Sequence, residues 1–244
     1  MSSLALCVKS HAYMGGATTP ETYMDKWDNS CTLATYADMK APVVDVQSTD
    51  LICRSPDMAD DRKPFSIGAG ETIRLTWAIG GNATFTEEPI KGPCSFWLAK
   101  QSFKGIGPNW SKIQEYTNNG KTGEDAKWCT DEILTTYDGK KKAGTFDVQI
   151  PEDIEPGLYI LRSEIIDILH AEVTNYDDYT MGARYYPNCL VLDITGEGTT
   201  PLKGTADIMK EYKKYYKTPL LASPSAKFVY PGPKALTTTL STYT

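Results

Sequence analysis

This sequence lacks three features that would point to common kinds of partner. No apolar run is long enough to span a bilayer, so the sequence predicts no membrane-spanning helix. The net charge of −6 and the absence of any long Lys/Arg cluster argue against nucleic acid or an anionic membrane as the main partner. No internal repeat divides the 244 residues, and all-β domains often reach this size, so we expect one domain.

Histidine is also scarce, because only His11 and His170 occur. The apolar run from Leu4 to Val8 is similar to the end of a signal peptide, although it is shorter than the roughly 7–15 residues of a full apolar segment. We therefore interpret residues 1–10 as a truncated signal peptide. Val8 and Ser10 stand where small residues precede a cleavage site, so cleavage after Ser10 would expose the amino group of His11.

The cysteines and sequons indicate an oxidising compartment. The chain has six cysteines, and Asn82 (Asn-Ala-Thr) and Asn109 (Asn-Trp-Ser) are candidate glycosylation sites. Together they predict a secreted, disulfide-bonded glycoprotein.

Alternating apolar residues punctuated by Gly and Pro predict an all-β fold. Ile73, Leu75, Trp77 and Ile79 alternate with polar or small residues, which is typical of a half-buried strand. Further strands are expected at 94–99, 145–150, 158–168 and 190–195, and a short helix at 206–215. This spacing predicts an immunoglobulin-like or fibronectin-like β-sandwich with long surface loops.

The segment that follows Pro156-Gly157 is the expected centre of the fold. Proline sets the first corner of a turn, and Gly157 accepts a positive φ at the second. Both parities of the strand from Leu158 to Ile168 carry apolar side chains, so we expect a central strand that is buried on both faces.

Several motifs carry a resemblance to a known family. The order PGLYILR, SEII, LH and GARYYPNC, with DVQSTDLIC before it and KFVYPGP after it, resembles the fungal lytic polysaccharide monooxygenases of auxiliary activity family nine. The resemblance extends over residues 11–236 and leaves 237–244 as a disordered tail. It implies a secreted, monomeric, copper-dependent enzyme that oxidatively cleaves insoluble cellulose or a related β-glucan.

The resemblance also implies a site. In the family, copper is held by a histidine brace made from the amino group and imidazole of an N-terminal histidine and a second imidazole. His11 matches the first ligand and Tyr186 matches the axial tyrosine. His170 matches the second-sphere histidine, and Arg184 stands where the family has a glutamine. Phe228 falls where members often present a tyrosine to flat cellulose.

Three departures from the family pattern bear on this site. Ile90 stands where the family's His-x-Gly-Pro motif has its copper histidine, and an aliphatic side chain cannot coordinate a metal. One additional residue separates Ser163 from His170, which inverts the side-chain face unless a bulge absorbs it. The cation of Arg184 would weaken copper binding or require a nearby anion.

Each candidate residue also has a simpler interpretation. His11 can be an ordinary surface residue, His170 a hydrogen-bonded structural histidine and Tyr186 a packed core residue. Phe228 can anchor a loop instead of stacking on sugar rings. Glu87 and Glu88 can reach the metal through a shifted loop or form a solvated turn.

The resemblance implies a disulfide between Cys53 and Cys189, which would stabilise the fold by about 4–5 kcal/mol in the chain-entropy model. Without residues 1–10, this pair leaves Cys31, Cys94 and Cys129, one of which would be unpaired. Cys94 can pair with Cys129 or with Cys31.

The family resemblance and the departures from it together predict either an impaired monooxygenase or a non-catalytic relative that binds glycan or copper.

Overall fold

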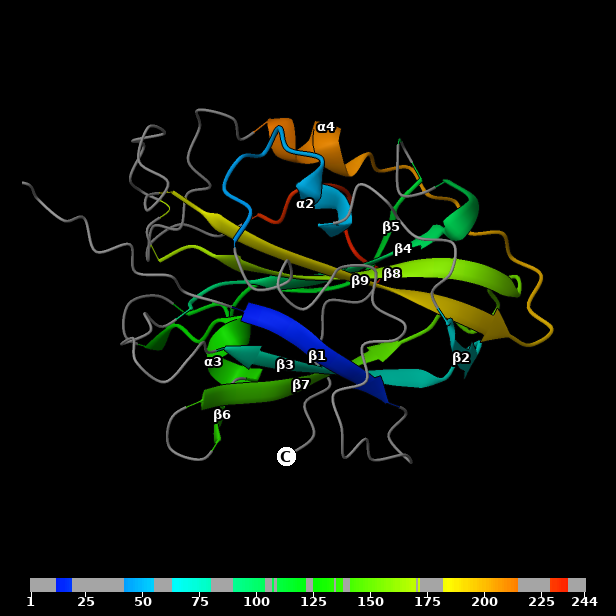
Figure 1. Ribbon diagram of the computed structural model, residues 1–244, viewed down its shortest axis with the longest axis horizontal. Helices are drawn as coiled ribbons and strands as arrows, with labels where there is room; N and C mark the ends of the chain where they lie inside the picture. Colours follow the sequence, from blue (N-terminus) through cyan, green and yellow to red (C-terminus); the bar gives the residue numbers. More distant parts are fainter. Residues whose placement is uncertain are drawn as a thin grey trace, which may run out of the picture.

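The computed structural model describes residues 12–18, 42–54, 63–79, 90–103, 107, 109–121, 125–133, 135–137, 141–169, 171, 182–214 and 229–236. Two sheets stack face to face and confirm the predicted β-sandwich (Figure 1). The first sheet has the order β1 (Ala12–Thr18), β3 (Thr72–Ile79), β7 (Lys141–Gln149) and β6 (Thr135–Tyr137). The second has the order β2 (Phe65–Gly68), β9 (Arg184–Thr195), β8 (Gly157–Asp167), β4 (Cys94–Lys100) and β5 (Ser111–Tyr116).

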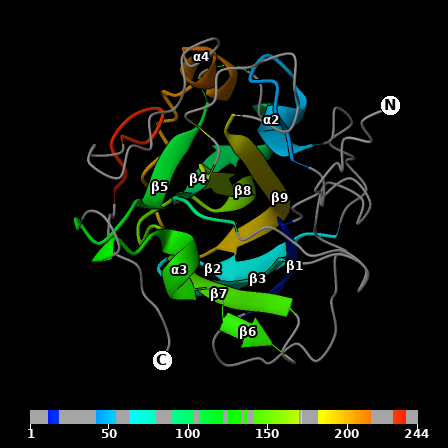
Figure 2. The ribbon, with the colours of Figure 1, turned by 90° about the vertical axis from the view of Figure 1, so that its left-hand side faces the viewer.

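Short helices cover the outer face of the five-stranded sheet. Both α2 (Asp50–Cys53) and α4 (Ile208–Lys213) lie on the side away from the four-stranded sheet, as Figure 2 shows. The described residues also include the helices η1 (Gln101–Phe103) and α3 (Cys129–Ile133). None of the helices in the described part of the chain is long and apolar enough to cross a membrane.

This layering gives the five-stranded sheet two buried faces. The inner core lies between the sheets, and the outer core lies beneath α2 and α4. The inner core includes Trp77, Ile90, Phe146, Leu161, Ile165 and Tyr186. The outer core includes Leu51, Trp97, Ile160, Ile166, Val191 and Tyr212.

Strand β8 occupies the centre of its sheet, as the sequence predicts. It pairs with β9 on one side and with β4 on the other. Tyr159, Leu161 and Ile165 point into the inner core, while Ile160 and Ile166 point into the outer core. Side chains of successive strand residues point to opposite faces, so apolar residues at both parities match a strand buried on both sides. At its start, Gly157 has the expected positive φ, 142°.

Strand β9 begins earlier than the alternating segment 190–195 indicates. It starts at Arg184 and contains Pro187. The Tyr185 amide donates to the carbonyl of Val43 at 2.9 Å, on the side away from β8. The nitrogen of Pro187, two residues further along, points to the same side of β9. Strand β2 lies on that side but pairs only with Leu192–Thr195, so it does not reach Pro187. No ladder hydrogen bond is therefore lost, and the strand tolerates the proline.

Two disulfides join cysteines within the described residues. One joins Cys53 in α2 to Cys189 in β9, which is the pair that the resemblance implies. The other joins Cys94 in β4 to Cys129 in α3, which selects one of the two partners left open for Cys94. Cys31 lies outside the described residues.

The predicted helix at 206–215 is present in a shorter form as α4. Asp207 precedes it, and its carboxylate accepts a hydrogen bond from the Lys210 amide at 3.2 Å. This cap satisfies one of the amides that the first turn of a helix leaves without a partner.

Candidate functional site

The candidate site lies where β8 ends and β9 begins. Tyr186 points from β9 into the inner core and is fully buried. The Arg54 guanidinium carbon lies 5.9 Å from the centre of the Tyr186 ring, and Arg54 Nη2 donates to the Tyr185 carbonyl at 3.1 Å. Tyr186 therefore packs against apolar side chains and a guanidinium. A metal-binding role for it stays a prediction.

Arg184 has the nearby anion that a buried cation requires. Arg184 and Asp167 are direct cross-strand partners on β9 and β8, and they are 4% and 1% exposed. Arg184 Nη1 lies 3.7 Å from Asp167 Oδ2. Arg184 and Tyr186 are two residues apart on β9, so their side chains point to the same face of the sheet. The ion pair thus lies on the Tyr186 side of the sheet.

Asp167 also binds backbone groups. Its Oδ1 accepts hydrogen bonds from the amides of Leu169 at 3.0 Å and Lys91 at 3.3 Å. Asp167 lies in the strand expected at 158–168, where the sequence alone indicates no role for it. The requirement of Arg184 for an anion was the signal that could have identified it.

Ile90 opens a segment that runs beside the end of β8. The Ile166 amide donates to the Pro93 carbonyl at 3.0 Å, and the Ile168 amide donates to the Lys91 carbonyl at 2.8 Å. A Cβ on Gly92 would lie 1.9 Å from the carbonyl oxygen of Ile166, so only glycine permits this approach. Ile90 itself is 5% exposed and belongs to the inner core.

Ile90 does not supply the family's second copper ligand. Ile90 offers no donor atom at the second ligand position, and its side chain is packed in the core. At the same end of the sheet, Asp167 balances the charge of Arg184, so the pair adds no net charge that would attract a divalent cation. Within the described ranges, no group of three or more His, Cys, Asp or Glu side chains could hold a metal ion.

The additional residue between Ser163 and His170 is not absorbed by a bulge in the paired part of β8. The β8–β9 register is regular from Gly157 opposite Ile194 to Asp167 opposite Arg184. His170 itself lies outside the described residues, as do His11, Phe228, Asn82, Glu87 and Glu88.

Asn109, the other sequon asparagine, is half-buried beside a buried tryptophan. Its amide donates to the Gly107 carbonyl at 2.9 Å, and Trp110 is fully buried. A Cβ on Gly204 would lie 2.0 Å from the carbonyl oxygen of Asn109, so two loops meet closely here. Glycosylation of Asn109 stays a prediction.

A buried polar cluster lies on the opposite face of β8, and sequence reasoning missed it. We call Arg162, Glu164, Tyr212 and Tyr230 the outer-face cluster. Arg162 Nη2 donates to Glu164 Oε1 at 2.6 Å, and both tyrosine hydroxyls donate to Glu164 Oε2, that of Tyr230 at 3.1 Å. Charged residues at alternate positions of an otherwise apolar strand were the available signal.

The outer-face cluster ties α2 and the C-terminal segment to the sheet. Arg162 donates to the carbonyls of Ile52 at 2.8 Å and Leu51 at 2.9 Å. Burial lowers the pKa of Arg162, but the Glu164 carboxylate outweighs this effect and the pKa is raised. Burial, reinforced by the negative charge of Glu164, raises the pKa values of Tyr212 and Tyr230.

Comparison with known proteins assigns the family. The family model for Auxiliary Activity family 9 (formerly GH61) matches residues 7–223. The AA9 family lytic polysaccharide monooxygenase A of Collariella virescens is 27% identical over 186 residues, covering 74% of this chain and 64% of that protein. This chain thus spans less than two thirds of the length of that relative.

Solved structures agree on the fold. The structure named CvAA9A superposes with a TM-score of 0.73 at 23% identity, covering 92% of this chain and 97% of that one. A cellulose-active polysaccharide monooxygenase from M. thermophila gives a TM-score of 0.62 at 21% identity, covering 93% and 97%. The family match over most of the sequence, together with this shared sandwich, shows that the chain belongs to Auxiliary Activity family 9, the family of lytic polysaccharide monooxygenases.

Proposed function

We propose that this chain is a secreted lytic polysaccharide monooxygenase-type protein that engages insoluble β-linked glucan such as cellulose, and that its copper-dependent oxidation is impaired. Family membership supports the substrate class, since relatives are lytic polysaccharide monooxygenases and one solved neighbour is described as cellulose-active. In this proposal the protein acts as a monomer, and its partner is the polysaccharide, not nucleic acid or a membrane.

The buried side chain of Ile90 carries the impairment. Imidazole nitrogen is a preferred ligand of Cu(II), and an isoleucine packed in the inner core supplies no substitute. The proposed ligands that remain are the amino group and imidazole of His11 and the phenol of Tyr186. His170 and Arg184 occupy the positions beside the metal. Because the described residues do not fit copper, we assign no copper-based step to them.

Phe228 supplies the proposed contact with sugar. The apolar faces of β-linked glucose stack on aromatic rings, and Phe228 precedes the anchored segment 229–236 by one residue. Tyr230 holds that segment through its hydrogen bond to Glu164, and the Leu236 amide donates to the Lys112 carbonyl at 3.2 Å.

The pairing of Arg184 with Asp167 favours a second candidate function. A protein that keeps the family fold but fills the copper environment with an ion pair can act as a non-catalytic glycan-binding relative. Residual metal binding through His11 would make it a copper-binding relative. In both cases glycan or copper is bound and glucan is not cleaved.

Two measurements on one preparation test the proposal. Protein whose amino terminus is shown by mass spectrometry to be His11 is incubated with cellulose or chitin, and the bound fraction is measured. Soluble oligosaccharides are then analysed by mass spectrometry with and without Cu(II) and ascorbate. We expect retention on cellulose, a loss of retention in Phe228→Ala, and fewer oxidised products than from Ile90→His.

The outcomes separate the candidates. Retention without any reductant-dependent product from the wild type favours the non-catalytic relative. A wild type that produces as much oxidised product as Ile90→His would contradict the impairment. Absence of retention on both polysaccharides, with no oxidised product, would overturn the glucan assignment.

A further inference from the structure

The ion pair between Asp167 and Arg184 stands at the junction of three chain segments. It joins the last residue of β8 to the first residue of β9. Through its second oxygen, Asp167 also accepts the amide of Lys91, the residue next to Ile90. One carboxylate therefore connects both strand ends and the segment that carries the second ligand position.

The segment from Ile90 to Pro93 is fixed further by its backbone. Its carbonyls accept hydrogen bonds from the amides of Ile166 and Ile168, and the Gly92 amide donates to Thr130 Oγ1 at 3.0 Å. The Thr130 amide returns a hydrogen bond to the Gly92 carbonyl at 3.3 Å. Each of these contacts comes from protein atoms, so none of them requires a metal ion.

Burial makes the two charges depend on each other. A carboxylate or guanidinium that is withdrawn from water is costly unless an opposite charge and hydrogen bonds compensate it. Asp167 receives two amide hydrogens and a cation, and Arg184 receives an anion directly across the strand pair. Loss of either member removes an opposite charge from the other buried ion.

We propose that the Asp167–Arg184 pair organises this end of the sandwich in the role that a metal ion would otherwise have. The pair holds the strand ends and the segment 90–93 together, so the local structure forms without copper. This inference deepens the proposed function, and it rests on the part of that proposal that places Ile90 at the second ligand position. Asp167 and Arg184 are positioning residues and take no part in a reaction.

A double-mutant cycle measures the energetic coupling between Asp167 and Arg184. Asp167→Asn keeps an acceptor oxygen and removes the charge, and Arg184→Gln introduces the residue found in the family. We expect each single variant to lower Tm by about 6 °C or more, because each removes one member of a buried ion pair. The double variant should melt above the less stable single variant, since it removes both charges. Tm losses that simply add in the double variant would overturn the inference.

Chelation with EDTA tests whether the stability of the wild type depends on a bound metal ion. The wild type should melt at the same temperature in EDTA as without it. If EDTA lowers the Tm of the wild type by as much as the Arg184→Gln substitution does, a metal organises this region and the inference is overturned.

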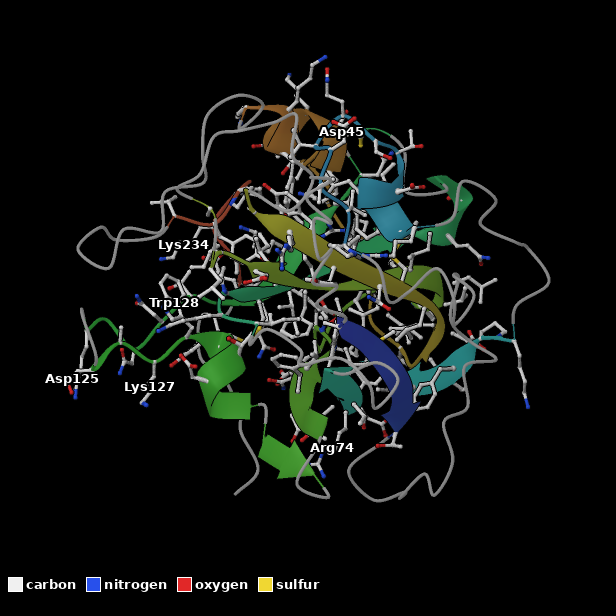
Figure 3. All side chains as sticks on the ribbon, turned by 60° about the vertical axis from the view of Figure 1, so that its left-hand side comes forward. Asp45, Arg74, Asp125, Lys127, Trp128 and Lys234 are labelled. Carbon is white, nitrogen blue, oxygen red and sulfur yellow. A yellow bond between two sulfur atoms is a disulfide. The ribbon has the colours of Figure 1, made fainter. Side chains whose placement is uncertain are left out.

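Hydrogen exchange reports on the position of the segment, and it stays informative if a single variant folds poorly. In the wild type, the amides of Lys91 and Leu169 should exchange slowly, and Asp167→Ala should accelerate both. The matched control is Asp147→Ala, which removes a cross-strand pair with Arg74 on the four-stranded sheet, with both contacts at 2.7 Å. Figure 3 labels Arg74. Fast exchange of both amides in the wild type, or equal acceleration in both variants, would contradict the role of Asp167.

Failure of this inference is distinguishable from failure of the proposed function. A wild type that yields as much oxidised product as Ile90→His would contradict the impairment without changing the melting temperatures of the cycle. Additive melting temperatures would overturn the role of the ion pair and leave retention on cellulose unaffected.

Discussion

Trp77 and Ser163 connect the two sheets of the sandwich through a single polar contact. The indole Nε1 of Trp77 on β3 donates to the hydroxyl oxygen of Ser163 on β8 at 3.1 Å, and both side chains are fully buried. Trp77 can satisfy its only donor here without leaving the apolar core. Ser163 is therefore the polar residue that allows a tryptophan to fill the space between the sheets.

Replacing Ser163 with alanine should destabilise the fold. The indole N–H would then lie in the core without an acceptor, which costs about 1–3 kcal/mol. Urea unfolding followed by tryptophan fluorescence gives the difference in unfolding free energy. Ser66→Ala in β2 is the matched control, since Ser66 is exposed, and it should change the unfolding free energy by less than about 0.5 kcal/mol. Equal effects of the two substitutions would refute this account of Ser163.

Replacing Glu164 with glutamine should have a larger effect. The variant preserves the shape of the outer-face cluster but leaves the Arg162 guanidinium buried without its anion, at a cost of about 3–5 kcal/mol. Urea unfolding at neutral pH measures this loss.

An exposed ion pair supplies the control for Glu164. Lys214 Nζ lies 2.5 Å from Glu211 Oε2, and the Lys214 side chain is 59% exposed. Lys214→Gln should change the unfolding free energy by less than about 1 kcal/mol. If Glu164→Gln is as mild as Lys214→Gln, the outer-face cluster does not contribute through its charges.

The buried tyrosines predict a loss of stability at alkaline pH. Burial and the charge of Glu164 raise the pKa values of Tyr212 and Tyr230 above their ordinary value of 10.0. Above pH 10 the unfolded chain releases phenol protons that the folded chain keeps. The folded state therefore binds more protons, and the unfolding free energy falls as pH rises, by up to about 1.4 kcal/mol per pH unit for each tyrosine.

Tyr230→Phe isolates one of these groups. The variant loses a hydrogen bond at every pH, but between pH 10 and 11 its unfolding free energy should fall less steeply than that of the wild type. Urea unfolding at a series of pH values gives both slopes. Parallel slopes would show that Tyr230 does not keep its proton in the folded state.

The sequence was sufficient to predict the sandwich and its central strand. The alternation of Ile73, Leu75 and Trp77 predicts β3, and the apolar residues at both parities after Gly157 predict β8. These signals are local, because side-chain periodicity depends only on neighbouring residues. β2 and β6 have too few residues for a periodic pattern. β9 begins before Pro187, and it tolerates the proline because β2 pairs only with Leu192–Thr195, which no local sequence pattern reveals.

The site depends on contacts between residues far apart in the chain. The sequence predicted that Arg184 would either weaken copper binding or have a nearby anion, and only the register of β8 and β9 identified Asp167 as that anion. In the same way, Cys94 had two possible partners until the fold placed Cys129 beside it. The residue types were readable from the sequence, and their pairing required the three-dimensional arrangement.

Copper titration tests the central claim most directly. Protein whose amino terminus is His11, confirmed by mass spectrometry, is titrated with Cu(II) by calorimetry beside the matched variant Ile90→His, and electron paramagnetic resonance reports the geometry. Loss of an outer-shell partner typically lowers metal affinity by about 10–100-fold, and loss of a ligand should cost at least as much. We therefore expect the wild type to bind Cu(II) at least about 10–100-fold more weakly than Ile90→His. Equally tight binding by the two proteins, with the same tetragonal signal, would contradict the impairment at Ile90.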